Sequence, residues 1–442
     1  MSPDVDPAPG ASELPPRVDV AVIGAGIAGT STALFLRRKG LSVALIEKGR
    51  VGGEQSSRNW GWCRAMGRDH REIPLIQESL RIWKRMDGLV GEDVGFRNCG
   101  ILYLCRTKAE MEAYAPWLEQ SERHQIGSRL IAPAEVRQLM PGFRGAVAGA
   151  LWTASDGRAE PSRASPAIAR AFAAEGGTLL TNCAVRALDM QAGRVSGVVT
   201  ERGRIAANAV VLAGGAWSRL FCGNAGIDLP QLKVLGSVIR THPIANGPDQ
   251  SAAGDHYAFR RRADGGYNVA HGGRSTVDVV PDSFRLFSAF LPALRSERKG
   301  LKLRVSKRFL EEWRTVRRWS ADEETPFERE RVLDPEPDGK LLRQAFDAFR
   351  ASNAAFAQAR EHSRWGGLID VTPDAVPVIS GIDALPGFFV ATGFSGHGFG
   401  IGPGAGRLMA DLVAGDDPVV DPAPFRFGRF RDGTPTLIDA GF

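Results

Sequence analysis

Three glycines and one acidic residue near the N-terminus have the types and the spacing of a dinucleotide-binding turn. Gly24, Gly26 and Gly29 follow an apolar run, and Glu47 ends a second apolar run. The first glycine permits a tight turn, the second lets the backbone approach a pyrophosphate, and the third lets a helix pack against the strand. Glu47 can accept hydrogen bonds from a ribose hydroxyl. The pattern therefore predicts that the chain binds a dinucleotide.

The elements that must position these residues are a strand, a helix and a second strand. Residues 20–23 and 43–46 are apolar, and a helical pattern runs between them to about residue 39. Free N–H groups at the start of that helix attract phosphates. This order is typical of a βαβ unit in an α/β fold. The alternative is a glycine-rich turn that binds no ligand.

Two further turns rich in small residues follow predicted strands. Residues 209–212 lead into Gly214, Gly215 and Trp217, and residues 388–391 lead into a loop of six glycines before a helix expected over 405–413. Small residues at a strand end allow the chain to pass close to a ligand. The second loop is longer and richer in glycine than a plain connection needs. Both turns are therefore candidates for contact with the bound dinucleotide.

Composition limits the classes of protein that remain. The 442 residues are too many for one minimal core, so two lobes are expected. The net charge is +6, but the Arg residues are spread over the whole chain, which favours a solvated surface over a nucleic-acid partner. Five cysteines without a CxxC pair indicate no disulfide framework and no zinc site, and favour a reducing compartment.

Membrane and targeting segments are not expected. The chain has no unbroken apolar run long enough to span a bilayer, so no integral membrane segment is predicted. Residues 1–17 are rich in proline and acidic residues, which predicts a disordered tail and not a signal peptide. A cytoplasmic location is the resulting expectation.

The three glycine-rich pieces, in this order, resemble the FAD-dependent superfamily of D-amino-acid oxidase, sarcosine oxidase and glycine oxidase. The resemblance spans about residues 18–415 and is stronger at the ends than in the middle. It implies an α/β fold with a Rossmann-like FAD-binding domain, and a discontinuous α+β substrate domain with a mixed or antiparallel sheet. We expect residues 18–95, 150–232 and 362–430 to form the FAD-binding domain, and residues 96–149 and 233–361 to form the substrate domain.

The resemblance also implies which residues bind FAD. The expected set is Gly24, Gly26, Ile27, Ala28, Gly29, Glu47, Lys48, Gln55, Ser56, Ser57, Arg58, Asn59, Trp60, Gly61, Val185, Gly214, Gly215, Trp217, Gly393, Ser395, Gly396, His397, Gly398 and Phe399. In the sarcosine oxidase branch a cysteine attaches the flavin, and this chain has Gly367 at that position. Non-covalent FAD is therefore expected.

Two departures from the family concern the substrate. Ile369 stands where relatives often carry an Arg, and Gly400 stands where the sarcosine oxidase branch has a Lys. Both residues of the relatives hold a substrate carboxylate, so we expect glycine, sarcosine and D-alanine to be poor substrates. Two explanations stay open. The substrate is a cationic or larger amine near Asp370, or its carboxylate is held by another arginine, for example Arg58, Arg64 or Arg260.

Five residues are candidates for the substrate pocket, and no catalytic residue can be assigned among them. Tyr257, Tyr267 and His271 lie in predicted strands of the substrate domain, Asp370 precedes the glycine-rich loop, and His397 lies within it. Packing in the sheet or in the loop is the alternative for each. The basic segment 314–318 could dock on a membrane or on an electron-acceptor partner, or could be an ordinary solvated helix face.

The predicted function is an FAD-dependent amine or amino-acid oxidase or dehydrogenase. Flavin N5 accepts a hydride from the carbon beside a nitrogen, and the resulting imine hydrolyses. The protein supplies orientation and electrostatics. The electrons then pass to oxygen or to a quinone or carrier protein. Two rival functions are an FAD monooxygenase that uses NADPH and a non-catalytic flavin-binding subunit.

Overall fold

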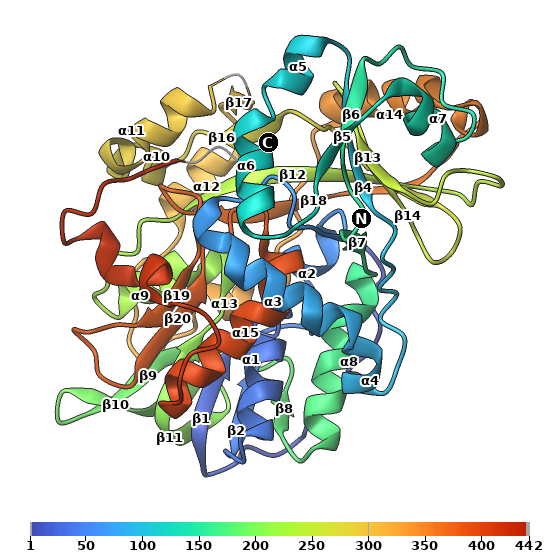
Figure 1. Cartoon of the computed structure of the whole chain (residues 1–442). Helices are drawn as coiled ribbons and strands as arrows, with labels where there is room; N and C mark the ends of the chain where they lie inside the picture. The colour runs from blue at the N-terminus through green and yellow to red at the C-terminus, as the bar shows by residue number, and fades with distance from the viewer. Residues whose placement is uncertain (1, 299, 439–442) are drawn as a thin grey trace.

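Two large β-sheets organise the chain. The computed structural model describes residues 2–298 and 300–438. One sheet has eight strands and the other has ten, and a further pair of short strands lies apart from both. Figure 1 shows the eight-stranded sheet in the lower part of the view and the ten-stranded sheet in the upper part. Each lobe is assembled from segments far apart in the sequence, and the predicted fold class is confirmed.

The eight-stranded sheet carries the predicted βαβ unit. Its main path runs β19–β20–β11–β1–β2–β8, with β9 and β10 attached beside β11. The neighbours β20, β11, β1, β2 and β8 are parallel, so their carboxyl ends meet at one edge. The strands are β1 (Arg17–Ile23), β2 (Val43–Ile46), β8 (Thr178–Leu180), β9 (Val185–Gln191), β10 (Arg194–Thr200), β11 (Gly203–Leu212), β19 (Val378–Gly381) and β20 (Phe388–Thr392).

The helices of this lobe pack closely, because glycines remove side chains at the contacts. They are α1 (Ile27–Arg38), α3 (Ile73–Lys84), α4 (Met86–Val90), α8 (Pro161–Ala174), α9 (Ser218–Asn224) and α15 (Gly398–Ala414). A Cβ at Gly402 would lie 2.8 Å from Ile27, and one at Gly406 would lie 2.4 Å from Ser31. The expected start of this last helix at residue 405 is wrong. The helix begins at Gly398, so Gly402 and Gly406 lie inside it and allow it to pack against α1.

The ten-stranded sheet is mixed and forms the second lobe. Its path runs β17–β16–β12–β15–β14–β13–β4–β6–β5, and β18 pairs with β12. The strands are β4 (Ile101–Cys105), β5 (Arg129–Ile131), β6 (Gly149–Thr153), β12 (Leu232–Thr241), β13 (Ser251–Ala253), β14 (Ala258–Arg261), β15 (Tyr267–Ala270), β16 (Ser275–Asp278), β17 (Leu301–Arg304) and β18 (Glu361–Val371).

The remaining elements surround and connect the two sheets. The separate pair of strands is β3 (Trp62–Cys63) and β7 (Gly157–Arg158). The other helices are α2 (Gln55–Arg58), α5 (Lys108–Glu112), α6 (Ala115–Arg123), α7 (Pro133–Leu139), α10 (Pro281–Arg285), α11 (Phe287–Ser296), α12 (Arg308–Arg314), α13 (Pro326–Arg329) and α14 (Gly339–Ser352). None of the helices in the described part of the chain has the length and apolarity to cross a membrane.

The structure differs from the expected boundaries between the lobes. Strands β6 and β18 belong to the ten-stranded sheet, although the expected boundaries at 150 and 362 assign most of both to the FAD-binding domain. Strand β18 pairs with β12 along its whole length, which fixes it in the second lobe. Conversely, Trp319 and Phe327 pack in the core of the eight-stranded lobe, although segment 233–361 was expected in the other domain.

The N-terminal segment also differs from its expectation. The composition predicts a disordered tail over 1–17, whereas the described residues 2–16 run along the eight-stranded lobe and β1 begins at Arg17. The Asp6 N–H donates to Ser162 O (3.0 Å), and Ala8 and Leu14 pack against the apolar cores. The few apolar residues of the segment find partners there, and the composition gives no sign of this.

Candidate active site

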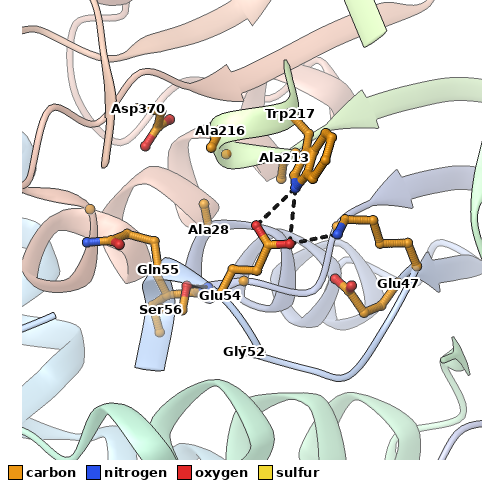
Figure 2. Close-up of a pocket in the computed structure, with 18 of the residues that line it drawn as sticks. Ala28, Glu47, Gly52, Glu54, Gln55, Ser56, Ala213, Ala216, Trp217 and Asp370 are labelled. Atoms are coloured by element: carbon orange, nitrogen blue, oxygen red, sulfur yellow. Dashed lines mark hydrogen bonds and ion pairs between the residues drawn. The ribbon is translucent and has the colours of Figure 1, made fainter. Parts of the chain in front are cut away.

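A first cavity lies at the carboxyl ends of the parallel strands. Its walls come from the turn after β1, the end of β2, helix α2, the turn after β11 and the loop before α15. Figure 2 shows Ala28, Glu47, Ser56, Ala213 and Ala216 around this space. In open α/β sheets, ligands bind at this edge. Sixteen residues of the expected FAD-binding set line the cavity: Gly24, Gly26, Ile27, Ala28, Glu47, Lys48, Gln55, Ser56, Asn59, Val185, Gly214, Gly215, Trp217, Gly396, Gly398 and Phe399.

The glycines of the first turn have distinct steric roles. Gly24 has a φ of +97°, and a Cβ there would lie 2.5 Å from Ala213 O. A Cβ at Gly29 would lie 1.9 Å from Gly24 O, so this position does not line the cavity but lets α1 approach the turn. The Ile27 N–H donates to Ser56 Oγ (2.9 Å), which ties α2 to the start of α1. The turn is thus packed against Ala213 on one side and hydrogen-bonded to Ser56 on the other.

Glu47 lines the first cavity at the end of β2. Its carboxylate accepts hydrogen bonds from the N–H groups of Ala25 and Gly49, each at 2.8 Å. Burial raises the pKa of this carboxyl, and the neighbouring positive charge of Lys48 opposes that rise. The two backbone donors fix the side chain at the end of β2, where it faces the cavity.

Glu54 was not among the residues predicted to bind FAD, yet it organises one wall of the first cavity. Lys48 Nζ lies 2.6 Å from Glu54 Oε1, and Trp217 Nε1 donates to Glu54 at 3.0 Å. Figure 2 shows Glu54 and Trp217 pointing toward one another across the cavity wall. The two residues are 163 positions apart in the chain, so only the fold reveals the contact.

Asp370 forms hydrogen bonds with the loop before α15. Its side chain is buried and accepts hydrogen bonds from the Thr392 hydroxyl (3.0 Å) and from the Gly393 N–H (2.6 Å). Burial raises the pKa of this carboxyl, and the two donors oppose the rise. Asp370 lines the first cavity and not the second. Its Oδ2 atom therefore holds the loop in position.

A second cavity of about 670 Å³ adjoins the first one. The two share five lining residues: Gln55, Asn59, Ile369, Gly396 and Phe399. The second cavity continues from this junction between α2, the ten-stranded sheet and the loop before α15. Five more residues of the expected FAD-binding set line it: Arg58, Trp60, Gly61, Ser395 and His397. Ser57, Gly393 and Gly29 line neither cavity.

Two arginines form a positive wall in the second cavity. The Arg64 guanidinium lies 5.6 Å from the Tyr103 ring centre, and Arg68 is 5% exposed. Burial and the charge of Arg64 lower the pKa of Arg68 to about 9. Within the described residues neither arginine forms a salt bridge, and Arg68 Nη1 has no hydrogen-bond partner. Asp156, whose carboxylate accepts from the backbone between them, fixes the loop that carries both.

The two other candidate arginines have structural roles. Arg58 Nη1 lies 2.6 Å from Asp334 and also donates to Gly366 O (2.8 Å). Arg260 is fully buried and forms a salt bridge of 2.6 Å with Glu160. Their charges are already neutralised inside the protein. Of the three arginines that the sequence left open, Arg64 alone faces the second cavity without an acidic partner among the described side chains.

Two of the expected pocket residues, both histidines, line the second cavity. His397 Nδ1 lies 3.1 Å from Glu72 Oε2, and burial together with the charge of Arg68 lowers the pKa of the imidazole. His271 accepts a hydrogen bond from the Gly273 N–H (3.2 Å), and burial lowers its pKa too. The Nε2 atom of His271 is buried and has no hydrogen-bond partner within normal distance among the described residues.

The two expected tyrosines are not brought into either cavity. The Tyr267 hydroxyl donates to Pro248 O (2.7 Å), and Tyr257 stacks on Phe259 with ring centres 6.1 Å apart. Burial raises the pKa of Tyr257 to about 12. Both rings belong to the core of the second lobe. Tyr103 lines the cavity instead, and its strand β4 carried no signal of this in the sequence.

The residues that line the first cavity fit FAD. The glycine turn and the start of α1 suit a pyrophosphate, Glu47 suits a ribose, and the junction of the two cavities offers a place for a flat ring. Gln55 Oε1 is buried at that junction and has no hydrogen-bond partner in the described part of the chain. It can therefore accept a hydrogen bond from a bound ring.

A family model described as DAO, FAD dependent oxidoreductase, matches residues 19–412. The chain belongs to this family. Sarcosine oxidase subunit beta from Rhodobacter capsulatus is 28% identical over 426 residues, which cover 94% of this chain and 89% of that protein. Glycine oxidase from Pseudomonas aeruginosa is 24% identical, with coverage of 92% and 97%. Among solved structures, L-amino acid deaminase from Proteus myxofaciens in complex with anthranilate superposes with a TM-score of 0.92 at 31% identity, covering 98% of this chain and 97% of that one.

Membership confirms the predicted family, cofactor and reaction class. The chain is an FAD-dependent oxidoreductase that oxidises the C–N bond of an amine or amino acid. FAD supplies the hydride acceptor for the carbon beside the nitrogen. The two cavities are consistent with this reaction. The lining of the first cavity suits the dinucleotide, and the second cavity adjoins the expected position of the flavin ring.

Proposed function

We propose that this oxidoreductase acts on amino acids whose carboxylate is bound by Arg64 and Arg68 and whose side chain fills the rest of the second cavity. The observation that carries the proposal is the buried Arg68 guanidinium, which has a free Nη1 and no acidic partner among the described residues. A buried unpaired charge is costly, and a carboxylate offsets that cost with charge-assisted hydrogen bonds.

The size and walls of the second cavity support larger amino acids. Its volume is about 670 Å³, and Trp60, Trp62 and Tyr103 provide aromatic walls. Glycine, sarcosine and D-alanine would leave most of this space unfilled and would gain little from the walls. The similarity to L-amino acid deaminase supports the L-series of primary amino acids.

The arginine pair also assists the reaction through the protonation state of the substrate. The amine must lose its extra proton before a hydride can leave the neighbouring carbon. Two guanidinium groups close to the carboxylate disfavour an adjacent ammonium group, and the aromatic walls desolvate it. The chain therefore orients the carboxylate and lowers the pKa of the bound amine with the same residues.

We propose that FAD is held in the first cavity without a covalent bond. The proposed contacts are the glycine turn for the pyrophosphate, Glu47 for the ribose and the shared junction residues for the ring. A Cβ at Gly367 would lie 2.3 Å from Gln55 Oε1 and 3.0 Å from Arg58 Cβ, so the position leaves no room for an attaching cysteine. Oxygen or a quinone or carrier protein is the proposed electron acceptor.

The test compares Arg68→Met and Arg64→Met with Arg81→Met, a control that removes an exposed guanidinium which lines neither cavity. Each variant is reduced anaerobically with L-phenylalanine and with phenethylamine, which lacks the carboxylate. Loss of a buried charge-assisted pair costs about 3 kcal/mol, so kcat/KM for phenylalanine should fall about 100-fold in the first two variants.

The amine provides the internal comparison. With phenethylamine the three variants and the parent should react at similar rates. This amine has no carboxylate, so removing Arg64 or Arg68 takes away no contact with it. If Arg68→Met slowed both compounds equally, or if the parent preferred the amine, the carboxylate site would be disproved. The FAD content of each variant, read from its absorbance, separates a binding defect of the substrate from loss of cofactor.

A further inference from the structure

One segment of the chain leaves the second lobe and packs on the eight-stranded lobe before it returns. We call residues 319–334 the strap. The strand β17 before it belongs to the ten-stranded sheet, and helix α14 after it packs in the core of the second lobe. Within the strap, by contrast, Trp319 and Phe327 pack in the core of the eight-stranded lobe. Figure 1 shows α13, the helix of the strap, in the lower part of the view and α14 in the upper part.

Aromatic contacts and an ion pair anchor the first half of the strap. Trp319 Nε1 donates to Arg186 O (2.8 Å), and the Phe327 ring lies 5.4 Å from the Trp319 ring, centre to centre. Phe327 also contacts Trp217 edge to face, with ring centres 5.7 Å apart. Glu328 forms an ion pair of 2.8 Å with Arg186. Buried aromatic side chains dominate the energetics of such contacts. The strap is therefore part of the packed structure of this lobe and not a loosely attached loop.

The second half of the strap crosses the loop that follows β2. Lys48 Nζ donates to Glu330 O (2.8 Å) and to Arg331 O (3.0 Å), and Arg331 Nη1 donates to Lys48 O (3.0 Å). The two backbones approach so closely that a Cβ at Gly49 would lie 2.3 Å from Arg331 O. This crossing comes directly after Glu47, which is the proposed ribose ligand. The strap therefore lies at the ribose end of the first cavity.

Three residues of the strap line the first cavity, and none of the three lines the second: Phe327, Arg331 and Val332. The Arg331 guanidinium is already engaged, because it forms an ion pair with Glu201 and donates to Lys48 O. It therefore holds the strap in place and is not a ligand of the pyrophosphate. Val332 and Phe327 give this end of the cavity an apolar surface. A flat, weakly polar group is the part of a dinucleotide that suits such a surface.

We propose that the strap is an adenine-binding wall, in which Val332 and Phe327 contact the base of FAD and Arg331 fixes the wall to the eight-stranded lobe. The inference rests on the proposed placement of FAD in the first cavity. In that placement the pyrophosphate lies at the glycine turn and the ribose at Glu47, so the adenine is the part of FAD that reaches the strap. FAD is thus held by a segment whose two ends belong to the second lobe, and binding of FAD stabilises the docked strap.

The first experiment removes FAD from the full-length protein and measures the dissociation constant of added FAD from the change in flavin fluorescence. Val332→Asp places a charge against the adenine, and Arg331→Gln removes the ion pair with Glu201. Each should weaken FAD binding at least tenfold. The matched controls are Val305→Asp and Arg329→Gln, which change exposed residues that line none of the cavities found in the described structure. Both controls should bind FAD like the parent.

The second experiment tests the adenine contact itself. Trypsin cleaves after arginine, and Arg329 is an exposed site within the strap, so Arg329→Gln identifies the fragment that this cleavage produces. In the FAD-free parent, saturating FAD and saturating ADP should each slow the cleavage at least tenfold, whereas FMN, which has no adenine, should not.

The inference is overturned if Val332→Asp, with the melting temperature of the FAD-free parent, binds FAD as tightly as the parent does. It is also overturned if ADP gives no protection from trypsin, and this result decides alone if Val332→Asp does not fold. Either result leaves the proposed function standing. A parent that binds no FAD would contradict the proposed cofactor site instead, so the two failures are distinguishable.

Discussion

Replacing Gly29 with alanine tests the steric argument for the dinucleotide turn. The added Cβ would lie 1.9 Å from Gly24 O, against 3.4 Å for ordinary van der Waals contact, so α1 must move about 1.5 Å from the turn. The obstacle is backbone, which cannot rotate away as a flexible side chain can. Overpacking of this kind costs about 3 kcal/mol, whereas alanine gains about 1 kcal/mol over glycine inside a helix.

The expected net loss is therefore about 2 kcal/mol of folding free energy, which lowers the melting temperature, and the displaced turn should lower the ratio of bound flavin to protein. Gly88→Ala is the matched control, because Gly88 lies inside α4 and a Cβ there meets nothing within 4 Å. It should be neutral or slightly stabilising. The assay is thermal unfolding together with the ratio of flavin to protein absorbance. Equal stability and equal flavin content in the two variants would show that a Cβ at Gly29 is tolerated, contrary to this prediction.

Three further predictions concern the buried contacts around the site and the second lobe. Burial raises the pKa of the Asp338 carboxyl, but the ion pair with Lys302 (2.6 Å) outweighs this effect and lowers the pKa from 3.8 to about 2. Asp338→Asn should therefore cost about 1 kcal/mol above pH 3.8, and thermal unfolding should show this gap closing as the pH falls toward 2; a gap independent of pH would contradict it. Gly367→Cys should lose FAD through the clash with Gln55, and acid precipitation should release all flavin from the parent; flavin retained in the precipitate of the parent would contradict this. Asp370→Ala leaves two buried donors of the loop without an acceptor and should cost about 3 kcal/mol and reduce the flavin-to-protein ratio; an unchanged ratio would rule out its positioning role.

The first cavity could be predicted in large part from the sequence, because its residues lie in local patterns. Gly24, Gly29 and Glu47 form a motif in which spacing along the chain determines position in space. The contact between Glu54 and Trp217 could not be found in this way. It depends on where the turn after β11 lies relative to the loop after β2, and no local pattern reports that distance.

For the second cavity, an alternating pattern of residues in a predicted strand was not enough to identify the side chains that line it. Tyr257 and Tyr267 were expected to face a pocket because they lie in predicted strands, but that pattern does not say which face of the sheet is covered by helix α14. Arg68 was missed because it lies in a loop with no regular period. Its significance comes from its burial and its missing partner, which are properties of the folded chain.

The most direct test of the central claim is the visible spectrum of the purified protein, recorded anaerobically while amino acids are added. We expect a yellow protein whose flavin absorbance is lost rapidly on addition of a large L-amino acid and far more slowly with phenethylamine, which lacks the carboxylate. A yellow protein that is reduced by NADPH but by no amino acid would contradict it, and so would a protein that cannot take up FAD.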